Sequence, residues 1–197
     1  MNQRLILPLN HARLTASWKT EIYRSRFGFS HYGIDLVSSS GQTLVYASGE
    51  GEVLAAGWDN IFGNIAVLRY NGALNHITGR RADVICRMFH FDRLLVQRGR
   101  KVNKDTKIGY YGNTGQYSFG AHLHLEADTD TAFPFHTPSL SGRSTFFSGS
   151  RHGATDTAML NPLALLHCKA SPPDNQRYTA ANGGFIHPED LAIPIIK

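Results

Sequence analysis

The sequence predicts a mostly β protein, an antiparallel sheet or sandwich-like arrangement with a groove bordered by loops. The chain of 197 residues contains 19 glycines and 8 prolines, which is typical of many short strands joined by turns. β-Branched and alternating runs recur about every ten residues, as in antiparallel sandwiches and barrels. With 42% hydrophobic and 18% charged residues, the composition is that of one globular domain and excludes a disordered chain.

The predicted strands lie before residue 129. Each is a short apolar or alternating run that ends near Gly, Ser or Asn. The runs are 33–37, 43–47, 51–58, 64–70, 82–91 and 122–128, with one more strand inside 105–115 before a glycine-rich turn. The intervening "DRLLVQRGRKV" is expected to form a short helical turn.

The composition changes after residue 128. Residues 129–158 are rich in Ser, Thr, Gly and Pro and are expected to form a long surface loop or insertion rather than a packed element. "NPLALLHC" predicts one short C-terminal helix with Pro162 in its first turn. We therefore expect one domain over residues 1–170, including the insertion, and a C-terminal extension of unknown role over residues 171–197.

Bulk properties argue against several classes of protein. The apolar runs are shorter than the roughly 18 residues of a membrane span, and residues 1–10 show no signal-peptide pattern. The formal charge of +5 favours an anionic partner, but the basic residues are scattered and indicate no nucleic-acid module. Cys86 and Cys168 are too few for a disulfide framework and are expected to be buried or reduced thiols.

Two histidines lie one residue apart in "FGAHLHLE". In an extended strand His122 and His124 face one side, while Leu123 and Leu125 face the other. If the leucines face the core, the two imidazoles stand together on the open face. That face is then either an ordinary polar surface or half of a metal site.

Further candidate ligands lie upstream, His31 and Asp35 in "SHYGIDL" and His90 in "MFHFD". Imidazole and carboxylate groups are suitable zinc ligands, and catalytic zinc sites use three of them with one open position. Histidines beside such a metal can move protons and stabilise an oxyanion. The spacing alone leaves open a β domain with solvated surface histidines.

Ordered blocks of the chain resemble the lysostaphin and LytM-type zinc endopeptidases. The blocks are "SHYGIDL", "GWDNIFGN", "MFHFDRLLVQRGRKVNKDTKIGYYGNTG", "GAHLHLE" and "LNPLALL". The resemblance covers residues 6–128 and 159–167, and it implies a β-sheet groove around one zinc ion per chain. It also implies hydrolysis of peptide bonds in the stem or cross-bridge peptides of bacterial peptidoglycan, by a zinc-bound water assisted by two histidines.

The resemblance assigns roles to the histidines and the aspartate. His31, Asp35 and His124 would bind the metal, and His90 and His122 would be catalytic. The histidine block reads "FHFD" where the family more usually has tyrosine and leucine flanks, but the aromatic and apolar character is kept.

The roles of two accessory residues, Tyr23 and Glu126, are less closely defined. Tyr23 lies in the region where some members of the family place an oxyanion-stabilising tyrosine. Glu126 points with the two strand histidines in the alternating pattern, so it is either a partner of an imidazole or a strand-end surface residue. His136 and His152, in an insertion longer than is typical of the family, are expected to be solvated.

The motifs also allow other functions. One alternative is a catalytically inactive LytM-like module that binds the wall or activates another hydrolase, and another is a phage-tail or lysis component that uses the same domain. A cysteine hydrolase is disfavoured because neither cysteine has a recognisable nucleophile context. We expect a peptidoglycan peptide as partner and action at the cell wall, periplasmic, extracellular or phage-delivered. The bond cleaved, the host and the oligomeric state stay open.

Overall fold

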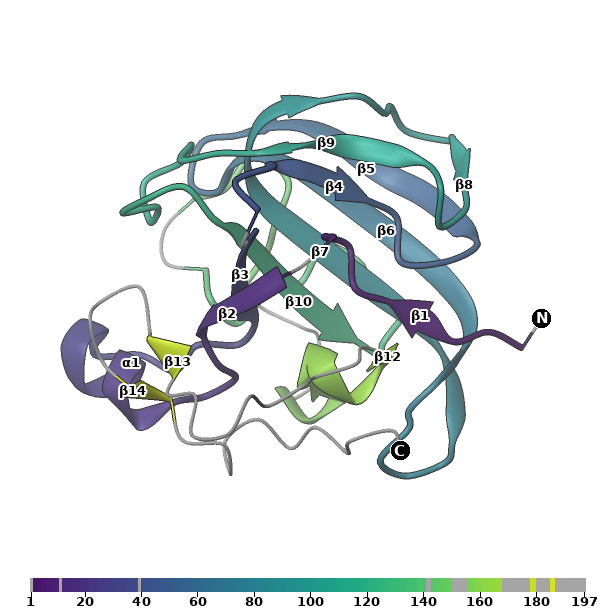
Figure 1. Cartoon of the computed structure of the whole chain (residues 1–197), viewed down its shortest axis with the longest axis horizontal. Coiled ribbons are helices and arrows are strands. Elements are labelled where there is room, and N and C mark those ends of the chain that lie inside the picture. The colour runs from purple at the N-terminus through teal and green to yellow at the C-terminus, as the bar shows by residue number, and fades with distance from the viewer. Residues whose placement is uncertain are drawn as a thin grey trace.

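The computed structural model describes residues 2–10, 12–38, 40–140, 143–149, 156–167, 178–179 and 185–186. It confirms the predicted fold class, since the main sheet is antiparallel and its central strands follow the order β2-β3-β10-β7-β6-β5-β8 (Figure 1). The strands are β1 (Leu5–Ile6), β2 (Ala12–Ala16), β3 (Ile34–Ser38), β4 (Leu44–Tyr46), β5 (Gly51–Asp59), β6 (Gly63–Leu74), β7 (Arg81–Leu94), β8 (Lys101–Val102), β9 (Lys107–Tyr111), β10 (Leu123–Asp128), β11 (Met159–Leu160), β12 (Leu166–His167), β13 (Tyr178–Thr179) and β14 (Phe185–Ile186).

The long strand β7 is the centre of the sheet. It pairs with β6 along one edge, and with β10 and then β9 along the other. Its residues 84–91 are buried without interruption, as expected of a strand covered on both faces. The predicted helical turn after this strand is wrong. β7 instead continues to Leu94 because Arg93 and Leu94 pair with β9, and the chain then turns into β8.

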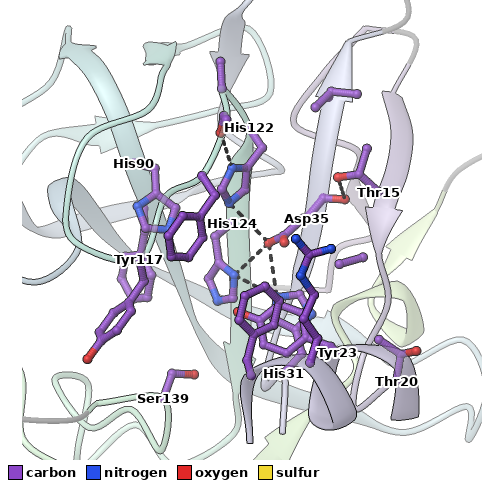
Figure 2. Close-up of a pocket in the computed structure, with 18 of the residues that line it drawn as sticks. Thr15, Thr20, Tyr23, His31, Asp35, His90, Tyr117, His122, His124 and Ser139 are labelled. Atoms are coloured by element: carbon purple, nitrogen blue, oxygen red, sulfur yellow. Dashed lines mark hydrogen bonds and ion pairs between the residues drawn. The ribbon is translucent and has the colours of Figure 1, made fainter. Parts of the chain in front are cut away.

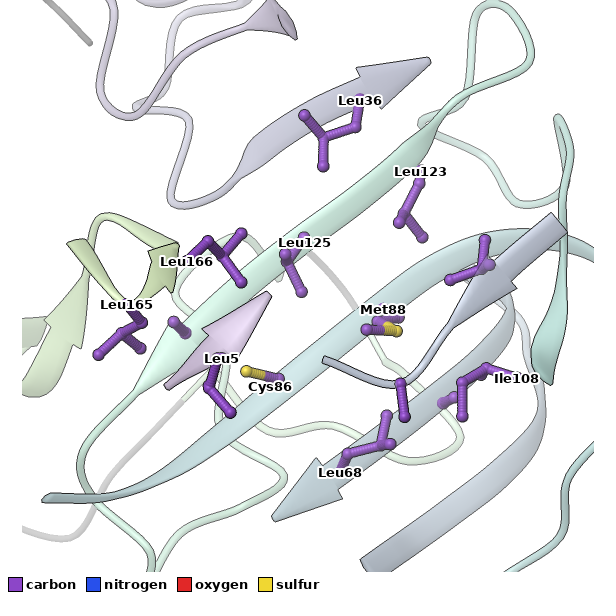
Figure 3. Close-up of a cluster of buried hydrophobic side chains, with 14 of the residues drawn as sticks. Leu5, Leu36, Leu68, Cys86, Met88, Ile108, Leu123, Leu125, Leu165 and Leu166 are labelled. Carbon is purple, nitrogen blue, oxygen red and sulfur yellow. The ribbon is translucent and has the colours of Figure 1, made fainter. Parts of the chain in front are cut away.

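The main apolar core lies against one face of β7 and β10 (Figure 3). Leu123 and Leu125 are completely buried in it, together with Cys86 and Met88. The leucines therefore face the core, and the alternate residues of β10 face the other side of the sheet. Burial raises the pKa of the Cys86 thiol to about 12, so this cysteine stays a protonated core residue. Cys168 lies outside the described residues.

The described residues of the insertion pack on the sheet, whereas a surface loop rather than a packed element was expected. The Asp59 carboxylate accepts hydrogen bonds from the backbone N–H groups of Phe62 and Phe146 and from the Ser144 hydroxyl. Phe147 is 6% exposed and packs in an apolar cluster on the second face of the sheet. Phenylalanines within a Ser- and Gly-rich segment bury enough area to order it.

The histidines of the insertion were also expected to be solvated. His136 is instead buried, with Nδ1 3.2 Å from the Ser148 carbonyl oxygen. His152 lies outside the described residues.

The helical elements also differ from the expectation. α1 (Glu21–Phe27) was not predicted; it ends at Gly28, which has a left-handed φ of 79°. The predicted C-terminal helix is only a 3₁₀ turn, η2 (Pro162–Ala164), where the Asn161 side chain accepts a hydrogen bond from the Leu163 N–H. A second 3₁₀ turn, η1, covers Asp156–Ala158. The boundary expected near residue 170 stays a prediction.

None of the helices in the described part of the chain has the length and apolar character needed to cross a membrane.

We predict that Asp59→Ala destabilises the fold by about 2–4 kcal/mol, because it leaves several buried donors without an acceptor. Equilibrium unfolding in urea measures this loss. The control is Asp105→Ala, which removes an exposed carboxylate. It should change the free energy of unfolding by less than about 0.5 kcal/mol. A similar small change for Asp59→Ala would contradict the anchoring role of this carboxylate.

Candidate metal centre and groove

Strands β3 and β10 bring three potential metal ligands together. Asp35 and His124 are direct cross-strand partners, and His31 lies just before β3. His31 Nε2 and His124 Nδ1 lie 3.1 and 2.9 Å from Asp35 Oδ1, and they are 3.1 Å apart. All three side chains are buried (Figure 2). These three atoms form what we call the ligand triangle.

The ligand triangle fits a zinc ion. Zinc bonds of about 2.0–2.1 Å in tetrahedral geometry separate the ligand atoms by about 3.3 Å, close to the distances found. His31 Nδ1 lies 2.9 Å from the Ser17 carbonyl oxygen. Because a carbonyl oxygen only accepts hydrogen bonds, Nδ1 of His31 carries the hydrogen. Its Nε2 therefore has a lone pair available for a metal ion bound by the triangle. His31, Asp35 and His124 thus form a group that could hold a metal ion.

The glycine of the "SHYGIDL" block makes room for the second histidine. A methyl group on Gly33 would lie 2.6 Å from His124 Nε2 and 2.7 Å from the Leu125 carbonyl oxygen. Real Cβ atoms do not approach other atoms so closely, so a residue with a side chain would displace the imidazole or strand β10.

Two further imidazoles lie beside the triangle. His90 Nδ1 is 2.8 Å from the Thr114 carbonyl oxygen, and His122 Nδ1 is 2.7 Å from the Gly120 carbonyl oxygen. Both Nδ1 atoms therefore carry the hydrogen, and each Nε2 keeps a lone pair. The two ring centroids are 4.9 Å apart, and His122 Nε2 lies 3.6 Å from Asp35 Oδ1.

A backbone irregularity directs His90 into the site. Its φ is 68°, a left-handed conformation unusual for a residue with a side chain. The register of β6 and β7 shifts here, so that His90 and Phe89 oppose Ile65 alone. Such bulges commonly redirect a side chain next to an active site.

The loop between β9 and β10 holds both carbonyl groups that orient these imidazoles. The Asn113 side chain accepts hydrogen bonds from the Gly120 N–H and the Ser118 hydroxyl, both at 2.7 Å. Gly115, with a φ of 91°, passes so close to the Phe62–Gly63 backbone that no Cβ would fit. The "GNTG" sequence therefore shapes this loop.

Burial and neighbouring charges shift the pKa values of Asp35 and His90. Burial alone would raise the pKa of Asp35, but His31, His122 and His124 outweigh it and hold the pKa well below its usual range. Burial and the neighbouring His122 and His124 lower the pKa of His90 to about 3, so this imidazole is neutral at neutral pH.

The two accessory residues, Tyr23 and Glu126, lie against the imidazoles of His31 and His124. The Tyr23 ring stacks on His31 with centroids 4.4 Å apart, and burial and the charge of Asp35 raise the pKa of its phenol. Glu126 is buried rather than a strand-end surface residue, and its Oε1 lies 3.6 Å from His124 Nε2. Burial would lower the pKa of His124, but Asp35 and Glu126 raise it to about 9.

One cavity of about 440 Å³ is lined by the residues of the triangle, His90, His122 and Tyr23. Aromatic residues form part of its wall, and the sequence reasoning missed them. They are Phe27, Phe29, Tyr117 and Phe119. The Phe27 and Phe119 rings stack with centroids 5.9 Å apart, although Phe119 is 78% exposed. The dense aromatic content of "RFGFS" and "QYSFG" is the signal that could have found them.

The model of peptidase family M23 matches residues 29–133, a segment that contains the ligand triangle and both further imidazoles. The chain belongs to peptidase family M23. This M23 chain is 33% identical over 96 residues to the peptidoglycan DD-endopeptidase ShyA of Vibrio cholerae, and 28% identical over 164 residues to the glycyl-glycine endopeptidase ALE-1 of Staphylococcus capitis. The matches cover 49% and 77% of this chain, but only 20% and 40% of the relatives' lengths.

Solved structures share the M23 fold. LytU is 22% identical, with a TM-score of 0.51 over 79% of this chain and 84% of its own. Csd3 of Helicobacter pylori is 17% identical, with a TM-score of 0.52 over 85% of this chain and 36% of its own. At these identities the comparison shows the fold alone. Together with the family match, it confirms the predicted resemblance to the LytM-type and lysostaphin-like proteins.

We predict that Gly33→Ala lowers the stability by about 1–3 kcal/mol, as overpacking does in a filled interior. Thermal unfolding followed by circular dichroism measures the loss. Gly149→Ala is the matched control, since a Cβ there meets only ordinary contacts with Leu140. Equal behaviour of the two variants would show that the approach of Gly33 to β10 is unimportant.

Proposed function

We propose that this M23 chain is a zinc-dependent endopeptidase that hydrolyses peptide bonds in the stem or cross-bridge peptides of bacterial peptidoglycan. The observation that carries the proposal is a buried ligand triangle beside two imidazoles with free Nε2 lone pairs, all in one cavity. Two relatives named as peptidoglycan DD-endopeptidases and one named as a glycyl-glycine endopeptidase support the substrate class and a site of action at the cell wall.

In this proposal His31, Asp35 and His124 hold one zinc ion per chain. When bound, zinc supplies Lewis acidity, which polarises a carbonyl oxygen and makes water more acidic. Asp35 contributes the only negative charge of the triangle, and its strongly lowered pKa keeps it ionised and available as a ligand. Glu126 serves as the carboxylate partner of His124 Nε2.

His90 and His122 carry the proton in this mechanism. A neutral imidazole with a free Nε2 accepts the proton of the attacking water and then donates it to the leaving amine. The carbonyl oxygens of Thr114 and Gly120 keep each Nδ1 protonated, so each Nε2 is the acceptor. The protonated phenol of Tyr23 is a further donor for the negatively charged oxygen of the tetrahedral intermediate.

We predict that the purified chain binds about one zinc ion, and that His124→Ala loses it because a ligand is removed. Mass spectrometry of the metal content, on protein purified without added metal, checks both. His76→Ala, which removes a histidine outside the cavity, should retain the zinc. A wild-type chain that stays free of zinc even after reconstitution would refute the metal assignment and favour a wall-binding module without activity.

We further predict that His90→Ala and His122→Ala keep their zinc but lower kcat by about 10²–10⁴-fold, the usual contribution of a proton-transferring group. Release of amines from purified peptidoglycan measures the rate. The substrates should include walls with glycine bridges and walls with direct D-alanyl cross-links, because the named relatives differ in this respect. Full activity in either variant would exclude that histidine from catalysis.

A further inference from the structure

The carboxylate of Glu126 joins the predicted ligand His124 to the segment that follows β10. Glu126 is completely buried, and its Oε1 lies 3.6 Å from His124 Nε2. That nitrogen is buried and has no hydrogen-bond partner among the described residues, and the Glu126 carboxylate is the charged group that faces it. Since the second nitrogen of a ligating imidazole fixes its orientation, the position of Glu126 determines how His124 presents Nδ1.

Two hydroxyl groups of the insertion hold Glu126 in place. Thr137 Oγ1 donates a hydrogen bond of 2.6 Å to Glu126 Oε1, and Ser139 Oγ donates one of 2.9 Å to the same oxygen. Both contacts have the length of good O–H···O bonds. Bonds to an ionised carboxylate are roughly twice as strong as neutral ones, so they restrain the oxygen that faces His124.

The other side of the carboxylate is held less closely. Arg87 Nη1 is 3.5 Å from Glu126 Oε2, whereas Arg87 Nη2 lies 2.9 Å from Asp128 and Nε donates to the Pro134 carbonyl oxygen at 2.9 Å. The Arg87 guanidinium therefore compensates the buried negative charge of Glu126, but its shortest hydrogen bonds are to Asp128 and Pro134. The two hydroxyl groups are the short contacts that fix the rotation of Glu126.

We propose that Thr137 and Ser139 are positioning residues, which fix Glu126 so that it holds the His124 imidazole in the ligand triangle. The inference rests on the proposed function and extends it, because it gives the insertion a role at the metal centre. Ser139 also lines the cavity that contains His124 (Figure 2). The hydrogen bonds of Thr137 and Ser139 thus lead from the cavity wall to Glu126, whose Oε1 faces His124 Nε2 at 3.6 Å.

The test is the zinc affinity of the double variant Thr137→Val/Ser139→Ala, measured by competition with a chromophoric chelator. We expect binding about 10–100-fold weaker than in the wild type, as found when outer partners of metal ligands are removed. Thr137→Ser keeps the hydroxyl group and should bind zinc as the wild type does. An affinity of the double variant within about twofold of the wild type would overturn the proposal.

A matched control separates positioning from general loosening of the insertion. Ser144 belongs to the same insertion, but its hydroxyl donates to Asp59 and it does not line the cavity. Ser144→Ala should leave the zinc affinity unchanged. If it weakens zinc binding as much as the double variant does, the proposal is wrong.

A measurement on metal-free protein distinguishes failure of this inference from failure of the proposed function. The Nε2–H of His124, which faces Glu126 and is distinguished from Nδ1 by its ¹⁵N shift, should give a slowly exchanging signal in ¹⁵N-histidine NMR of the wild type, and the double variant should lose it. A wild type without zinc affinity refutes the proposed function, and the ring signal then decides the inference alone. A signal that persists unchanged in the double variant overturns the positioning role.

Discussion

The antiparallel pairing of β3 with β10 is the interaction on which the site depends. It sets Asp35 directly opposite His124, so that a carboxylate and an imidazole from distant parts of the chain meet across two adjacent strands. The register is fixed from the opposite face, where Leu123 and Leu125 are completely buried in the apolar core. A slip of one residue would exchange the two faces, placing imidazoles in the core and leucines in the groove. The hydrophobic effect thus determines where the polar ligands lie.

The second face of the sheet is organised by buried carboxylates. Asp59 accepts hydrogen bonds from the Ser144 hydroxyl and the Phe146 N–H of the insertion. Glu126 accepts hydrogen bonds from the hydroxyls of Thr137 and Ser139 in the same insertion. Arg87 supplies the compensating positive charge and also binds Asp128. A buried charge is tolerated only when it is paired and hydrogen-bonded, so these groups and the insertion depend on one another. The described residues of the insertion are therefore packed against the sheet beside the candidate metal centre.

Local pattern was sufficient for strands β3 to β7, β9 and β10 and for the opposite orientation of leucines and histidines, because alternation in a strand is a property of neighbouring residues. The short strands β1, β2 and β8 were not predicted. The ligand set followed from the resemblance to a known family. The packing of the insertion could not be predicted, since Asp59 and Phe147 act through contacts between segments far apart in sequence. The aromatic wall was missed for the same reason: Phe27 and Phe119 meet only in the folded chain. Composition alone also misjudged residues 92–102, because pairing with β9 overrides local preference.

The loop between β9 and β10 supplies the carbonyl oxygens of both Thr114 and Gly120, and thereby fixes the tautomers of His90 and His122 together. The orientations of the two imidazoles are consequently coupled. A displacement of this single loop, by a bound ligand or by a substitution at Asn113, would release both imidazoles at once. A change in the backbone of this loop therefore affects the orientation of both imidazoles together.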